Sequence, residues 1–159
     1  TERGKKQAQA TAMLLAQSPI SNLQSRIAVI YSSPLARARQ TAEFLAKETG
    51  ANVVIDERLR EVDFGEWTGH TWEQVLEKFG THAFDWLEKM DQAAIPGGES
   101  AAQFRARVEP CLRRILEQHH GQTVAVVCHG GVIRMLLALL LEVSCWREEG
   151  AWSRECGRL

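Results

Sequence analysis

Two short stretches of the chain are apolar throughout, and polar or small residues follow each of them at once. They are Ile27–Tyr31 and Thr123–Cys128, and both have the length of a strand. Runs of this kind are typical of strands that are buried on both faces, as in a parallel sheet. Val53–Ile55 is a third, shorter strand candidate.

Between these strands, apolar residues recur every three or four positions, which is the period of an amphipathic helix. The pattern predicts helices over residues 4–17, 35–49, 71–79 and 100–115, and an apolar helix over 132–141. Thr71-x-x-Gln74 and Ser100-x-x-Gln103 are possible capping boxes at two of the helix starts. Pro110 lies inside the fourth pattern, so we expect it to kink or split that helix.

Strands that alternate with helices predict an α/β fold with three layers, in which helices flank a mainly parallel sheet. Residues 56–69 and 94–99 have no clean period and are expected to be loops. A chain of 159 residues is by default one domain. We place this domain at 1–141, because residues 142–159 form a tail without a clear pattern.

Composition and charge exclude several classes of function. The net charge is −1, so no broad basic surface for nucleic acid is expected. The four cysteines have no zinc-site spacing and fit a reduced compartment, which predicts a cytoplasmic protein. The longest apolar run, Val132–Leu141, contains Arg134 and is too short to span a bilayer.

Ligands of open parallel sheets bind beyond the carboxyl ends of the strands. One such end carries His129, Gly130 and Gly131, directly before a predicted helix. The imidazole can donate to an anion, the glycines let backbone N–H groups come close, and a helix N-terminus favours negative charge. The alternative is that His129 only caps the helix.

The other strand end leads to Arg37, whose planar guanidinium matches phosphate oxygens. A cation in the first turn of a helix is unfavourable, and a bound phosphate would compensate for it. The alternative is a solvated Arg37 paired with a nearby Glu, and Arg39 is expected to face solvent.

The loop over residues 56–69 contains two candidate acids, Glu61 and Asp63, whose carboxyl groups can point into a cleft. A partly desolvated carboxyl there can protonate a leaving oxygen. The alternative is a surface loop in which both carboxylates are solvated.

No metal or organic cofactor is expected. His119 and His120 are adjacent and cannot share one helix face, and His70 and His82 have no partners at ligand spacing. The glycine patterns of nucleotide-binding loops and the esterase nucleophile elbow do not occur.

Taken in order, five segments resemble the motifs of the histidine phosphatase superfamily. The first is similar to its "L-T-x-x-G-x-x-Q-A" segment, the second to its phosphate-binding segment and the third to its acid loop. The match covers roughly residues 1–141. The segments are Thr1–Ala8, Tyr31–Ala42, Leu59–Gly69, Pro96–Ser100 and Val126–Arg134.

The resemblance implies a phosphomonoester hydrolase that acts on a small phosphorylated metabolite through a phosphohistidine. His129 matches the second histidine of the family and Arg37 one of its two arginines. Glu61 matches the acid that protonates the leaving oxygen, and the Gly130 N–H adds to the oxygen pocket. The short connection from Glu61 to Pro96 is more similar to small phosphatases, such as α-ribazole phosphatase, than to phosphoglycerate mutases.

The chain departs from the family pattern at both ends. The family's first strand, which is central in the sheet and ends in Arg-His-Gly with the nucleophile, has no match in residues 1–159, and neither has its last strand. We therefore expect this polypeptide to be unstable or to aggregate, and to have no turnover. Two alternatives stay open, a pseudophosphatase that binds phosphate ligands without catalysis, and phosphoryl transfer of the phosphoglycerate mutase type.

Overall fold

The computed structural model describes residues 1–17, 27–83 and 85–141. Contacts within the chain define two compact units. Of the described residues, the first comprises those within Thr1–Glu61 and Cys111–Val132, and the second those within Val62–Pro110 and 133–141. The tail over 142–159, which the sequence pattern separates from the 1–141 domain, lies outside the described residues.

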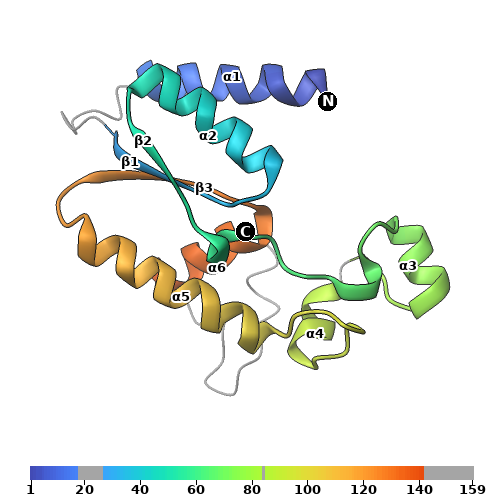
Figure 1. Ribbon diagram of the computed structural model, residues 1–159. Coiled ribbons are helices and arrows are strands. Elements are labelled where there is room, and N and C mark those ends of the chain that lie inside the picture. Colours follow the sequence, from blue (N-terminus) through green and yellow to red (C-terminus); the bar gives the residue numbers. More distant parts are fainter. Residues whose placement is uncertain (18–26, 84, 142–159) are drawn as a thin grey trace. The chain divides into compact units, whose positions relative to one another are not determined.

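The sheet of the first unit has three parallel strands in the order β2-β1-β3 (Figure 1). They are β1 (Ile27–Ser32), β2 (Asn52–Ile55) and β3 (Thr123–Val127). Ser32 of β1 pairs with Ile55 on one side and with Val127 on the other, so the three strands end in register. All three predicted strands, and their parallel arrangement, are confirmed.

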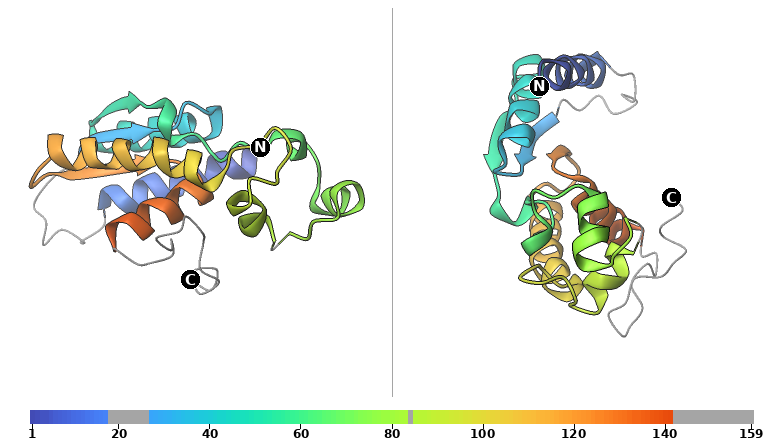
Figure 2. Two further views of the ribbon diagram at one scale, coloured as in Figure 1. Left: turned by 90° about the horizontal axis from the view of Figure 1, so that it is seen from below. Right: turned by 90° about the vertical axis from the view of Figure 1, so that its right-hand side faces the viewer.

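Helices α1 (Glu2–Gln17) and α2 (Ala36–Thr49) lie side by side against one face of this sheet (Figures 1 and 2). Ile30 of β1 is fully buried there, in a core with Ala12, Ala42 and Leu45. Tyr31 points to the opposite face, where its hydroxyl meets Gln118 and His119 at the end of α5. Because side chains alternate along a strand, β1 is buried on both faces, as its apolar run indicates.

Strand β3 has a partner on one side only among the described residues, namely β1. All five of its residues are partly exposed, whereas the last four residues of β1 are buried. A fourth strand therefore cannot enter between the described strands and would have to join at an outer edge. Such an open, uncharged edge is a site for strand addition or aggregation.

The second unit contains two short helices, α3 (Trp72–Phe79) and α4 (Trp86–Asp91). The predicted capping box of α3 is confirmed, since Thr71 and Gln74 exchange both hydrogen bonds. Helix α4 was not expected, because six residues are too few for a clear period. Aromatic rings of this unit pack edge to face on one another, among them Phe64, Trp67, Trp72 and Trp86.

Helices α5 (Ala101–Gln118) and α6 (Gly130–Leu140) each contribute to both units. Ser100 and Gln103 form the second predicted capping box. Pro110 does not split its helix, one of the two outcomes expected for it, because α5 continues through it. Pro110 and Ala106 are both exposed, so water can satisfy the Ala106 carbonyl that Pro110 leaves without a donor. Of the helices in the described part of the chain, none is long and apolar enough to cross a membrane.

The loop after Glu61 is fixed by a close crossing of two backbone segments in the second unit. Glu66 N–H donates to the Pro96 carbonyl at 3.0 Å, and Glu99 N–H donates to the Asp63 carbonyl at 2.8 Å. Two guanidinium nitrogens of Arg107 hold the Glu99 carboxylate at 2.7 and 2.8 Å. At the crossing, a Cβ on Gly65 would lie 2.2 Å from the Pro96 oxygen.

Gly65→Ala is expected to lower the free energy of unfolding by about 2–5 kcal/mol, because the added methyl meets backbone and φ is +50°. Gly69→Ala is the matched control, since φ there is +85° but nothing lies within 4 Å of the added Cβ. We expect the control to lose only about 1 kcal/mol in urea unfolding of the full-length protein. Equal losses would show that the close crossing does not stabilise the loop.

Candidate active site

The carboxyl ends of the three strands meet at one edge of the sheet. Ser33 N–H donates to the Val127 carbonyl at 2.9 Å, and Asp56 N–H donates to the Ser32 carbonyl at 3.0 Å. These bonds continue the parallel pairing one residue beyond the strands. They place the residues that follow β1, β2 and β3 next to one another, which is where ligands bind in sheets of this kind.

Three side chains converge at this edge, as the sequence predicted for two of them. The Nε of Arg37, in the first turn of α2, donates to Nδ1 of His129 at 3.2 Å. On the other side of the ring, Nε2 of His129 lies 2.7 Å from the Ser33 hydroxyl. His129 and Ser33 are buried, whereas Arg37 is exposed. The imidazole is therefore held at both nitrogens.

The guanidinium of Arg37 lies within ion-pair distance of no carboxylate among the residues that the structure describes, so the alternative of an Arg37–Glu pair is not observed. The first turn of α2 contains no acidic residue either. The positive charge is thus uncompensated at a helix N-terminus, which an anion bound at this place would relieve. Arg39, two residues on, is exposed as expected.

Glu61 reaches the same end of the sheet from the loop that follows β2. The Gly131 N–H donates to its Oε2 at 3.4 Å, which places the carboxylate at the N-terminus of α6, two residues from His129. Glu61 is half-buried, whereas Asp63, the other candidate acid, is exposed and accepts from Gly65 N–H. The structure thus brings Glu61 to the end of β3.

Gly130 is the first residue of α6 and is exposed, so its N–H belongs to the helix end that has no intrahelical acceptor.

Burial raises the pKa of the neighbouring Cys128 thiol to about 11, and the Glu61 carboxylate adds to the rise. Cys128 is therefore a neutral thiol near neutral pH and not a nucleophile. Within the described ranges, no group of three His, Cys, Asp or Glu side chains could hold a metal ion.

The family model of the histidine phosphatase superfamily (branch 1) matches residues 1–152. The chain belongs to this superfamily. The matched segment includes Arg37, Glu61 and His129, which the structure brings to the ends of the strands.

Several relatives that the chain resembles carry the names of phosphatases. Phosphoserine phosphatase 1 of Hydrogenobacter thermophilus is 35% identical over 156 residues, which are 98% of this chain and 69% of the relative. The structure of a mycobacterial glucosyl-3-phosphoglycerate phosphatase superposes with a TM-score of 0.76 at 32% identity, over 90% of this chain and 68% of the other. The α-ribazole phosphatase from Shigella flexneri gives 0.72 at 28% identity, over 88% and 66%.

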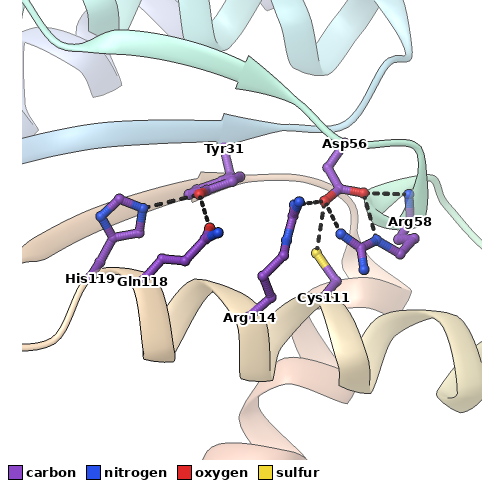
Figure 3. Close-up of polar contacts among 7 residues, drawn as sticks. All are labelled: Tyr31, Asp56, Arg58, Cys111, Arg114, Gln118 and His119. Carbon is purple, nitrogen blue, oxygen red and sulfur yellow. Dashed lines mark hydrogen bonds and ion pairs between the residues drawn. The ribbon is translucent and has the colours of Figure 1, made fainter.

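The chain also contains a buried carboxylate with charged partners that its sequence did not indicate (Figure 3). We call Asp56, Arg58, Cys111 and Arg114 the Asp56 cluster. The Asp56 carboxylate accepts from the backbone N–H of Arg58 at 3.0 Å and from the guanidinium of Arg58 at 3.0 and 2.8 Å. Arg114 and Cys111 of α5 donate to it from the other side. The cluster ties the end of β2 to α5 five residues before Glu61.

Because of the Asp56 cluster, the free energy of unfolding is expected to depend on pH in the acidic range. Burial alone would raise the pKa of Asp56, but the hydrogen bonds from Arg58 and Cys111 lower it from 3.8 to about 2. A carboxyl with a lowered folded-state pKa stabilises the protein above its unfolded pKa and loses this effect as pH falls. The full contribution is about 2 kcal/mol, and roughly half of it should be lost by about pH 3.

Urea unfolding of the full-length protein at about pH 5 and about pH 3 tests this expectation. Asp56→Asn should lower the free energy of unfolding at the higher pH, because Arg58 and Arg114 lose their counter-ion, and should lose about 1 kcal/mol less than the wild type on acidification. Asp85→Asn is the control, since Asp85 is exposed and its side chain makes no cap hydrogen bond. An unchanged acid dependence in Asp56→Asn would contradict the assigned role.

Proposed function

We propose that the complete protein hydrolyses small phosphomonoesters through a phosphohistidine intermediate. In this proposal Arg37, His129 and the Gly130 N–H bind the phosphoryl oxygens, and Glu61 is the general acid. The observation that carries the proposal is the 3.2 Å contact between Arg37 and His129, which come from two strand ends 92 residues apart. A guanidinium in contact with an imidazole, next to the N-termini of α2 and α6, is a site for a phosphate dianion.

The nucleophile is a histidine of an Arg-His-Gly segment outside residues 1–159. This part of the proposal rests on the family resemblance, because no histidine of the chain other than His129 follows an apolar strand. It is consistent with the length of the relatives, of which the chain spans about two thirds.

In the first step, a nitrogen of the nucleophilic histidine bonds to phosphorus while the bond from phosphorus to the ester oxygen breaks. The departing oxygen takes a proton from the Glu61 carboxyl and leaves as an alcohol. Charge grows on the phosphoryl oxygens and on the leaving oxygen, so donors aimed at these atoms lower the barrier. Arg37 and His129 donate hydrogen bonds to the phosphoryl oxygens, and Glu61 donates a proton to the leaving oxygen.

In the second step, Glu61 is ionised and accepts a proton from a water molecule. The water oxygen bonds to phosphorus, the bond from phosphorus to the histidine nitrogen breaks, and inorganic phosphate leaves. Glu61 is then protonated again, so one carboxyl acts first as acid and then as base. No metal ion or organic cofactor takes part in this scheme.

Hydrolysis of p-nitrophenyl phosphate by two polypeptides tests the proposal. The complete protein should hydrolyse the ester, whereas residues 1–159 alone should show no turnover and no cooperative melting transition. The open edge of β3 supports the second expectation. A cooperative melt of the 159-residue polypeptide together with hydrolysis above buffer would refute the need for a nucleophile elsewhere. Phosphate binding by the complete protein without hydrolysis would favour a pseudophosphatase.

A further inference from the structure

Ser33 is placed to control which nitrogen of His129 carries a proton. Its hydroxyl is fully buried and lies 2.7 Å from Nε2 of the ring. It also accepts a longer hydrogen bond of 3.3 Å from the Leu35 N–H. The Ser33 backbone N–H donates a hydrogen bond to the Val127 carbonyl, so the position of the Ser33 side chain is restricted.

The contacts of His129 define one arrangement of protons when no ligand is bound. A guanidinium can only donate, so Nδ1 accepts from Arg37 through its lone pair. A neutral imidazole with an unprotonated Nδ1 carries its proton on Nε2. Nε2–H then donates to Ser33, whose oxygen accepts.

When a phosphate binds between Arg37 and His129, Nδ1 of His129 must donate a hydrogen bond instead of accepting one. Phosphate oxygens accept hydrogen bonds, so Nδ1 must carry a proton to bind one of them. Nε2 then either keeps its proton, in an imidazolium, or gives it up and becomes an acceptor. A hydroxyl can pair with Nε2 in both cases, because it accepts and donates, whereas an alanine pairs in neither.

We propose that Ser33 is a positioning residue that holds the His129 ring through Nε2 and lets Nδ1 change from acceptor to donor when phosphate binds. The proposal deepens the proposed function and rests on it, because phosphate is the ligand that the change serves. Ser33 acts through His129 and does not contact the phosphoryl group in this scheme.

The imidazole ¹⁵N resonances of His129 in the complete enzyme test this inference, with His129→Gln used to assign them. In the wild type without ligand, the proton should reside on Nε2, and added inorganic phosphate should bring a proton to Nδ1. In Ser33→Ala, Nε2–H loses its acceptor, so the two resonances should shift from their wild-type positions. The same variant should lower kcat/KM by about 10–100-fold, the range known for loss of a hydrogen-bond partner behind a metal-ligating histidine.

Ser32→Ala is the matched control, because Ser32 is equally buried and adjacent, but its hydroxyl donates to the Ser33 carbonyl and not to His129. It should leave the His129 resonances unchanged even if it lowers stability. Wild-type resonances in Ser33→Ala, or equal shifts in both variants, would overturn the inference. If Ser33→Ala alone shifts the resonances while the complete enzyme hydrolyses no phosphomonoester, the proposed function fails and the control of the ring by Ser33 remains.

Discussion

His129→Ala should lower kcat/KM of the complete enzyme by about 10²–10³-fold for every phosphomonoester tested. The reason is that in the proposed mechanism the ring binds the phosphoryl group, which all substrates share, and not the leaving group. It is 6% exposed and held between Arg37 and Ser33, so it is pre-organised for the charge that develops in the transition state. Steady-state rates with two or three esters measure the effect.

The matched control for His129 is His120→Ala. His120 is exposed and follows α5, away from the strand ends that form the site, so its loss should change rates less than about twofold. Near-normal rates in His129→Ala, or a loss confined to one substrate, would remove His129 from the phosphate pocket.

Glu61→Gln should slow hydrolysis by about 10²–10⁴-fold for alkyl phosphates and much less for p-nitrophenyl phosphate. An alkoxide is a poor leaving group and needs a proton as it departs, whereas p-nitrophenolate leaves without one. The amide keeps the size of the side chain and still accepts from Gly131, so the change removes the proton and little else. The slope of log rate against leaving-group pKa reports the difference.

Glu57→Gln provides the comparison for Glu61. Glu57 lies four residues earlier, is exposed and pairs with Arg60 at 3.7 Å, a surface contact that contributes little. Its replacement should leave the slope unchanged. Equal slowing of good and poor leaving groups by Glu61→Gln would mean that Glu61 is not the acid.

The elements that the sequence predicted well are those whose local signals agree. The apolar runs of β1 and β3 have no helical period, and capping boxes at Thr71 and Ser100 set two helix starts to the residue. Pro110 shows the limit of the rule that proline breaks a helix. The loss of helix stability that a proline causes depends on whether water reaches the carbonyl that it leaves without a hydrogen-bond donor. That exposure is a property of the fold and not of the sequence pattern.

Part of the site could also be predicted. Arg37 and His129 each follow a strand of the parallel sheet, and parallel strands place their carboxyl ends together, so the proximity of the two residues follows from topology. The residue pattern alone left both Glu61 and Asp63 as candidate acids, and the family resemblance selected Glu61. The observed Gly131 contact favours Glu61.

The Asp56 cluster and the Ser33–His129 contact were beyond sequence reasoning. Asp56 and Arg58 are two residues apart, but Cys111 and Arg114 join them from more than 50 residues away through α5. Ser33 lies in the polar strand end that the sequence indicated, yet a serine there carries no signal of its own. Its proposed role depends on the His129 ring lying at hydrogen-bond distance from the Ser33 hydroxyl, which only the structure shows.

The central claim is that Arg37 and His129 bind the phosphoryl group, and calorimetric titration of the complete enzyme with orthovanadate tests it most directly. Arg37→Ala should raise the Kd by about 10–100-fold, because a charge-assisted hydrogen bond to the anion is lost. Arg39→Ala, on the same helix and exposed, should leave the Kd within about twofold. Wild-type affinity in Arg37→Ala, or an equal loss in both variants, would contradict the account.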